Sequence, residues 1–249
     1  MKRLLILAAL AVMLGGEVRA DFLLGWDFQT TSSGGTSLVA QDTAQPKVLR
    51  RNVGAIDGFL YLDGTNGSSN WTSSNTNTRE INAFAGTNVN ATNGLSTTTT
   101  SPAALALLNT TANNKSIVFK FDMTGYKDLV ISLAAQRTDT GFNSQVWEGS
   151  TNGTTWSSIG TLVGGTTSGT IRNSFSNTGV LTLGSYTGVD NSSTAYVRVT
   201  FSGASSASGN NRLDNIQFSA NAVPEPTTGL LLGVGTLACA AFRRNRRVA

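Results

Sequence analysis

The chain of 249 residues is long enough for one medium-sized domain with its own hydrophobic core, and its formal net charge is +4. It contains no histidine, and its single cysteine is Cys239. It therefore cannot build a Ser-His-Asp triad, a Cys-His nucleophile pair, an ordinary zinc site or an internal disulfide. Residues 21–222 hold 11 of the 18 basic and 12 of the 14 acidic residues, so the basic excess belongs to the two ends, and nucleic acid is not an expected partner.

The first 20 residues, MKRLLILAALAVMLGGEVRA, have the parts of a secretory signal peptide. Two basic residues come first, an apolar run follows at 4–14, and a small-x-small cleavage site lies at 18–20. The alternative, a helix of a protein core, does not explain this site or the position at the start of the chain. We expect signal peptidase to cut between Ala20 and Asp21.

Residues 21–222 show the alternation of apolar and polar side chains that is typical of half-buried β-strands. In SIVFKFDM, for example, Ile117, Phe119 and Phe121 share one face and Lys120 lies on the other. Polar, glycine-rich turn sequences separate such segments. We therefore expect an all-β domain over 21–222, an antiparallel β-sandwich of jelly-roll type. Strands are predicted at 22–29, 58–64, 116–123, 128–136, 144–150, 155–162, 179–186, 195–203 and 212–219.

Two stretches depart from this alternation. SPAALALLN, at 101–109, predicts a short helix with Ser101 as its N-cap and Pro102 at its first position. The stretch 65–100 is poor in large apolar residues, so we expect long exposed loops there around a short strand near 79–85.

The C-terminal segment, 223–249, combines a proline corner, an apolar stretch and a cluster of arginines. The apolar stretch 227–242 would be about 24 Å long as a helix, which is short for a hydrocarbon core of about 30 Å. A helix of this length can lie in the membrane transiently. The arginines after this stretch would stay on the cytoplasmic side of the membrane. The domain of residues 21–222 and the Pro-Glu-Pro at 224–226 would lie on the outer side.

This tail closely resembles the PEP-CTERM sorting signal of Gram-negative bacteria. That resemblance implies an exported protein that a membrane-embedded exosortase processes near the Pro-Glu-Pro, with delivery to the cell surface or an extracellular matrix rich in exopolysaccharide, as in a biofilm. The alternative is an ordinary C-terminal membrane anchor. The residues that carry the resemblance are Val223, Pro224, Glu225, Pro226, Arg243, Arg244, Arg246 and Arg247.

Two stretches of the body also resemble known modules. VWEGSTNGTTWSSIGTL, at 146–162, is similar to a strand-turn-strand hairpin of secreted jelly-roll modules. GNNRLDNIQFSA, at 209–220, is similar to their closing strand. Both patterns recur in PEP-CTERM proteins and in sandwich domains related to carbohydrate-binding modules, so they support the expected fold.

Three tryptophans, Trp71, Trp147 and Trp156, are candidates for glycan contact, because an indole ring can stack on the apolar face of a sugar ring. Trp147 and Trp156 lie in predicted strands, where packing inside the sandwich is the competing interpretation. Trp71 lies in a polar loop sequence and is the best candidate for an exposed ring.

Asp214 shares strand parity with Ile216 and Phe218, which would point its carboxylate inward. A buried carboxylate needs a partner, and jelly rolls of this kind can hold calcium between their first and last strands. Asp27, in the first predicted strand, is the candidate second ligand. Hydrogen bonds from neighbouring loop amides are the alternative, and no other cofactor is expected.

Three functions remain open, and neither of the first two is enzymatic. The protein is either a structural component of the surface or matrix, or a carbohydrate-binding module. Glycan hydrolysis is the least favoured, since it needs two carboxylates and Asp63, Glu80, Asp139 and Glu148 are scattered singly.

Overall fold

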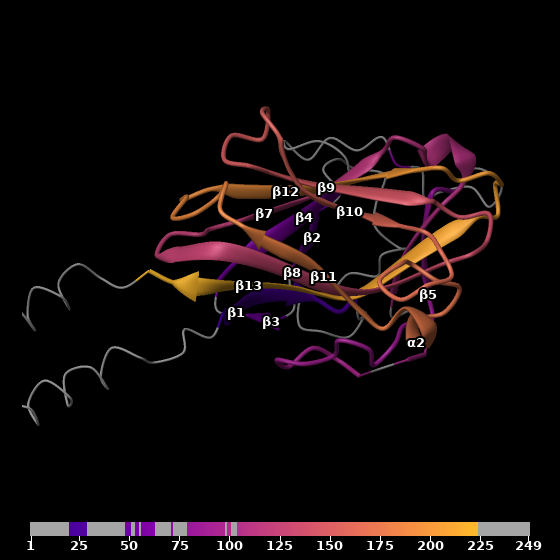
Figure 1. Ribbon diagram of the computed structural model, residues 1–249, viewed down its shortest axis with the longest axis horizontal. Helices are drawn as coiled ribbons and strands as arrows, with labels where there is room; N and C mark the ends of the chain where they lie inside the picture. Colours follow the sequence, from indigo (N-terminus) through magenta and orange to yellow (C-terminus); the bar gives the residue numbers. More distant parts are fainter. Residues whose placement is uncertain are drawn as a thin grey trace, which may run out of the picture.

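The computed structural model describes residues 20–28, 48–50, 53–54, 56–62, 71, 79–97, 99–100 and 104–223. Two antiparallel sheets form the body, one above the other in Figure 1. The seven-stranded sheet has the order β11-β8-β13-β1-β3, and β6 pairs with β13 and β5. Its strands are β1 (Asp21–Trp26), β3 (Val53–Gly54), β5 (Ile81–Phe84), β6 (Ala104–Leu108), β8 (Tyr126–Arg137), β11 (Val180–Tyr186) and β13 (Asn210–Ala222).

The six-stranded sheet has the order β10-β9-β12-β7-β4-β2. From β7 onward the chain changes sheet at every connection except the β9–β10 hairpin, as expected for a jelly roll. The predicted strands from 116–123 onward are confirmed as β7 to β13. The six strands are β2 (Val48–Arg50), β4 (Gly58–Leu62), β7 (Ser116–Phe121), β9 (Ser144–Ser150), β10 (Ser157–Val163) and β12 (Ala195–Ser202).

The core lies between the sheets and follows the predicted alternation. Ile117, Phe119 and Phe121 are buried, whereas Lys120 on the opposite face is only half-buried. Four aromatic rings meet across the two sheets around Phe119, whose centroid lies 4.9 Å from that of Trp26, 5.2 Å from Phe218 and 6.2 Å from Trp147. These rings join β1 and β13 of one sheet to β7 and β9 of the other.

The predicted helix at 101–109 is wrong in its described part, because Ala104–Leu108 is strand β6. β6 lies between β5 and β13, and Ala104 to Leu107 are all buried. A strand that is covered on both faces loses the alternation that marks a strand, and its alanine and leucine residues have high helix propensity. Tertiary pairing therefore outweighs the local preference. Ser101 and Pro102 lie outside the described residues.

Two short helical turns occur in the described part of the chain: η1 (Thr110–Ala112) and α2 (Phe175–Thr178). Phe175 of α2 packs with Ala104 and Ala134 on the outer side of the seven-stranded sheet, and Val89 packs against the same cluster. Strand β5 confirms the short strand expected near 79–85. The expectation of exposed loops on either side of it is wrong for Thr87 and Leu95, which are buried.

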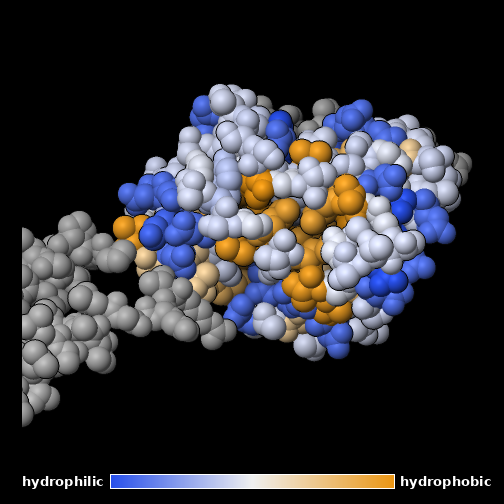
Figure 2. Space-filling view, in the orientation of Figure 1, coloured by the Kyte–Doolittle hydropathy of each residue, from blue (hydrophilic) through white to orange (hydrophobic). Residues whose placement is uncertain are grey.

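The edge strands β10 and β11 of the two sheets lie next to each other. A Cβ added to Gly160 of β10 would lie 3.0 Å from the side chain of Leu183 of β11, so the two strands approach each other closely there. Figure 2 shows apolar side chains gathered near the middle of this face of the molecule. Val163 of β10 and Val180 of β11 are among the exposed large apolar residues.

Both ends of the described body leave the sandwich on one side, because β1 and β13 are antiparallel neighbours and Asp21 lies opposite Ala220 (Figure 1). Among the described residues no helix has the length and apolar character needed to span a membrane. The predicted signal peptide up to residue 19, and the sorting residues Pro224, Glu225, Pro226, Arg243, Arg244, Arg246 and Arg247, lie outside this part of the chain.

Candidate functional site

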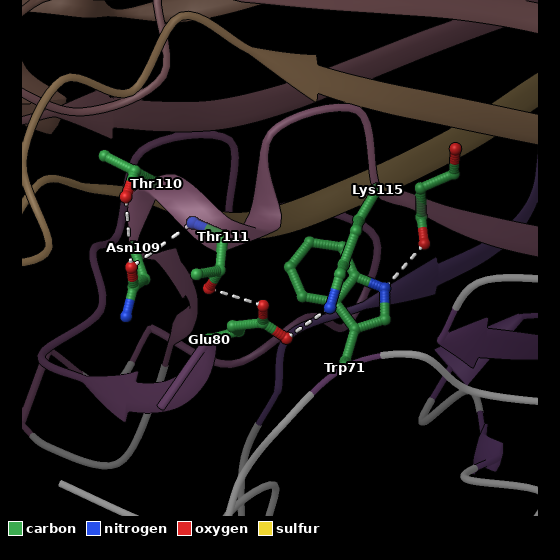
Figure 3. Close-up of polar contacts among 7 residues, drawn as sticks. Trp71, Glu80, Asn109, Thr110, Thr111 and Lys115 are labelled. Atoms are coloured by element: carbon green, nitrogen blue, oxygen red, sulfur yellow. Dashed lines mark hydrogen bonds and ion pairs between the residues drawn. The ribbon is translucent and has the colours of Figure 1, made fainter. Parts of the chain in front are cut away.

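Trp71 is buried, so the expectation that its ring is exposed is wrong. Its indole N–H donates a hydrogen bond to the backbone carbonyl of Ser116 at 2.8 Å, and its ring meets the ring of Phe201 at 6.3 Å edge to face. The Lys115 ammonium lies 5.9 Å from the ring centroid (Figure 3). Polar neighbours in sequence do not keep a tryptophan exposed when its polar N–H finds a buried carbonyl.

Glu80 lies beside this tryptophan and is also buried (Figure 3). One carboxylate oxygen accepts a hydrogen bond from the Thr111 hydroxyl at 2.7 Å, and the other pairs with the Lys115 ammonium at 2.6 Å. Asn109 caps η1 by accepting a hydrogen bond from the Thr111 N–H. Both oxygens of Glu80 are thus used to tie the start of β5 to η1 and β7. These contacts fit a structural role for Glu80.

Trp147 is fully buried and stacks nearly parallel to Phe119, with 10° between the ring planes, so packing in the core explains this residue. Trp156 is different, because it is half-buried just before β10. The Arg198 guanidinium lies 4.3 Å from its ring centroid and forms an ion pair with Glu148 at 2.7 Å. Glu148 is therefore also engaged by a cation.

Trp156 belongs to a larger group of aromatic and charged side chains on the outer side of the six-stranded sheet. We call this group the outer aromatic face; its members are Phe59, Tyr61, Lys120, Glu148, Trp156, Tyr196 and Arg198. Directly paired residues of antiparallel strands project to the same side of a sheet. The register Phe59–Lys120–Tyr196 forms one row across β4, β7 and β12, and Tyr61–Val118–Arg198–Glu148 forms the next across these strands and β9.

The outer aromatic face combines ring faces with hydrogen-bonding groups. Phe59 is 37% exposed, and its ring lies 6.4 Å from that of Tyr61. The Lys120 ammonium lies 5.7 Å from the ring centroid of Tyr196. Glu148 neutralises Arg198, so Lys120 is the only cation of the seven members without a carboxylate partner among them. A surface with a net charge of only +1 suits a polyhydroxylated ligand better than a highly charged one.

The predicted pair Asp27 and Asp214 is brought together by the pairing of β1 with β13. Asp214 is completely buried, and burial raises the pKa of its carboxyl from 3.8 to about 8. Hydrogen bonds from the backbone N–H groups of Thr87 and Asn215, at 2.7 and 2.8 Å, oppose this rise, whereas the charge of Asp27 adds to it. Asp27 accepts a hydrogen bond from the Ser96 N–H at 3.0 Å. The loop amides named as the alternative to calcium are therefore present.

The segment 87–96 covers this pair, and nothing in the sequence pattern pointed to it. The Asn215 side-chain amide donates to the carbonyls of Thr87 and Val89 at 2.8 and 3.0 Å, and Asn90 donates to the carbonyl of Asn215 at 2.7 Å. Asn90 and Asn215 have positive φ values of 60° and 46°, a conformation that asparagine adopts more readily than most residues. These asparagines are the one local signal that could have marked the contact.

The calcium hypothesis stays a prediction. The described residues contain no group of three or more acidic, histidine or cysteine side chains that could hold a metal ion. A calcium ion takes six to eight oxygen ligands, so carbonyl and amide oxygens would have to complete the site. The side-chain oxygen of Asn215 fits this role, because it is buried and has no hydrogen-bond partner.

Comparison with protein families matches residues 222–247 to the PEP-CTERM protein-sorting motif. No curated protein matches the sequence. Among solved structures, a CBM4 structure aligns with 78% of this chain and 99% of its own at 10% identity, with a TM-score of 0.40.

Two further structures resemble the sandwich more weakly. The CBM22-1–GH10 xylanase modules of Clostridium thermocellum align over 59% of this chain and 25% of theirs, with 10% identity and a TM-score of 0.37. The K1 cleaved adhesin domain of Lys-gingipain from Porphyromonas gingivalis aligns over 49% and 75%, with 11% identity and a TM-score of 0.31. Likenesses of this size do not identify a function.

The PEP-CTERM motif implies recognition by an exosortase and export to the cell envelope or surface. This chain is therefore an all-β sandwich that carries a PEP-CTERM sorting motif at residues 222–247.

Proposed function

We propose that this protein is a non-catalytic component of the bacterial cell surface or extracellular matrix, delivered by an exosortase-type sorting system. One observation carries the proposal: the matched sorting motif begins at residue 222, where the last strand of the sandwich ends. The folded body and the signal are therefore directly joined. Signal peptidase would remove residues 1–20, and the exosortase would process the tail near the Pro-Glu-Pro while the short apolar stretch lies in the membrane.

Mass spectrometry of the intact protein tests this proposal. We expect protein from the cell surface or medium of the native host to begin at Asp21 and end near Pro224, with or without an added group. Cells that lack the exosortase should retain the tail through Arg247. A protein that keeps Arg243 to Arg247 in both strains would show that the tail is an ordinary anchor and would contradict the proposal.

Glycan binding is the second candidate function, and the outer aromatic face favours it. Sugar rings stack on exposed aromatic faces, and their hydroxyls accept and donate hydrogen bonds. Trp156 and Phe59 offer rings at this surface, and Lys120, Arg198 and Glu148 offer donors and an acceptor. Since these charges leave a net charge of only +1, we propose neutral matrix polysaccharides as the ligand class. A matrix protein that binds no discrete glycan remains the alternative.

A glycan array with two variants separates these functions. We expect binding to neutral glycans, a loss of at least about tenfold in affinity for Trp156→Ala, and no change for Val180→Ala. Val180 is an exposed apolar residue of the other sheet, so its variant controls for nonspecific hydrophobic binding. Absence of binding to any glycan would leave the structural function. A preference for uronic acids over neutral sugars would contradict the ligand class.

A further inference from the structure

The last residues of β13 are held differently from the rest of the strand. As far as Ala220, β13 lies between β8 and β1, with Asp21 opposite Ala220. Of the described strands, only β8 lies beside the strand beyond Ala220: Asn221 lies opposite Lys127 and Ala222 opposite Tyr126. The backbone N–H of Val223 then donates to the carbonyl of Gly125 at 2.7 Å. Within the described part of the chain, the final three residues are thus paired on one side only.

Burial changes at the same point. Ala220 is completely buried, whereas Ala222 and Val223 are exposed and Asn221 is half-buried. Among the described residues, the Asn221 amide donates a side-chain hydrogen bond to the carboxylate of Asp128 at 3.2 Å. Separating Asn221 to Val223 from β8 would release no completely buried side chain, and strand ends with few buried contacts are where local opening costs least. If the opening extended to Ala220 and the residues before it, pairing with both β8 and β1 would break and the core would be uncovered.

The covalent chain leaves little distance between this strand and the sorting motif. Pro224 follows Val223 directly, and an extended chain spans at most about 3.5 Å per residue. Glu225 therefore lies within about 7 Å of Val223 while the strand end stays paired. An enzyme that holds its substrate as an extended strand needs free backbone on both sides of the bond it cuts. The folded sandwich would obstruct such an enzyme at a membrane surface.

We propose that Asn221 to Val223 are a releasable tether that separates from β8 so that the sorting enzyme can bind the Pro-Glu-Pro. While the strand end stays paired, the free chain from Val223 to Glu225 reaches about 7 Å. After release, the free chain begins at Ala220 and reaches about 17 Å to Glu225. Ala220 sets the limit of opening, because β1 and the core hold it. The inference rests on the proposed sorting function and adds the part of the folded body that positions the motif for processing.

A disulfide across the strand end tests this tether. Asn221→Cys with Lys127→Cys places two thiols on directly opposed positions, within the range that a disulfide needs, and exported proteins meet an oxidising environment. The variants are made in a Cys239→Ser background, because Cys239 is the only native cysteine. Pulse-chase in cells that produce the sorting enzyme then measures conversion of precursor to processed protein. We expect processing severalfold slower than in the background protein, and a normal rate for each single cysteine variant.

Two matched variants keep the result specific. Ser219→Cys with Val130→Cys joins the same two strands at a residue that precedes Ala220 in the sequence, where no opening is proposed. This disulfide should leave the rate of processing unchanged. Inserting Gly-Ser-Gly-Ser between Val223 and Pro224 of the locked protein should restore processing. A normal rate in the locked protein would overturn the tether while leaving the sorting function intact. Absence of processing in the wild-type chain would overturn both.

Discussion

Raising the pH from 5 to 8.5 in the presence of EDTA is expected to destabilise the protein, and Asp214→Asn is expected to remove most of that effect. The Asp214 carboxyl has a pKa of about 8 when folded, against 3.8 when exposed. Between these values the folded protein holds one more proton than the unfolded chain, so stability falls as the pH rises. The contribution is complete below about pH 4 and lost above about pH 8. Its upper limit is roughly 6 kcal/mol.

Urea unfolding at a series of pH values measures this effect. The amide introduced by Asp214→Asn cannot ionise, and its single oxygen replaces the two carboxylate oxygens that accept N–H bonds from Thr87 and Asn215. We therefore expect this variant to be about 1 kcal/mol less stable than the wild type at pH 5 and more stable at pH 8.5. Asp139→Asn, which changes an exposed carboxylate, should keep the wild-type slope. A wild-type stability that does not fall with pH would show that the two N–H bonds keep Asp214 ionised.

Adding calcium to the same samples tests the predicted metal site. A bound cation would hold Asp214 ionised, so the wild-type midpoint at pH 8.5 should rise and the pH slope should flatten. Asp214→Asn should respond much less to calcium. If calcium changes neither protein, the hydrogen bonds from segment 87–96 are sufficient to hold the two carboxylates.

Strands in which apolar and polar residues alternate could be predicted from the sequence, whereas β6, which consists of alanine and leucine residues, could not. The predicted segments of β7, β9 and β12 agree with the structure because their inner residues alternate with polar ones. β6 is buried on both sides, so its residues carry no such alternation and resemble a helix. A strand that is buried on both sides can therefore lack the polar residues whose alternation marks a strand.

The candidate sites divide in the same way. Position in the first and last strands correctly suggested that Asp27 and Asp214 lie together, because such strands pair in a jelly roll. The inward direction predicted from strand parity was wrong, because the register of β13 shifts after Asp214, which pairs with Ala134 of the outer cluster. The segment that covers them could not be predicted, since the Asn215 contact to Thr87 joins residues 128 positions apart. The prediction that Trp71 is exposed was wrong for a related reason. Its burial depends on contacts with Ser116 and Phe201, which are distant in the sequence.

Phe119→Ala is expected to cost about 3–5 kcal/mol of stability, because the side chain is fully buried where the two sheets meet. Its removal leaves a cavity bordered by Trp26, Trp147 and Phe218, which belong to three different strands and cannot all move into the space. For a domain of this size, the change corresponds to a fall in Tm of roughly 6–20 °C.

Phe59→Ala is the matched control, because it makes the same chemical change on the outer side of the same sheet. Its partly exposed ring belongs to the outer aromatic face, so we expect a cost below about 1 kcal/mol. Phe119→Leu should lie between the two, since leucine fills part of the cavity. Equal losses for Phe119→Ala and Phe59→Ala would contradict the assignment of the core to one side of the sheet. A large difference would show that the sandwich is stabilised from within, which leaves the outer aromatic face free for a ligand.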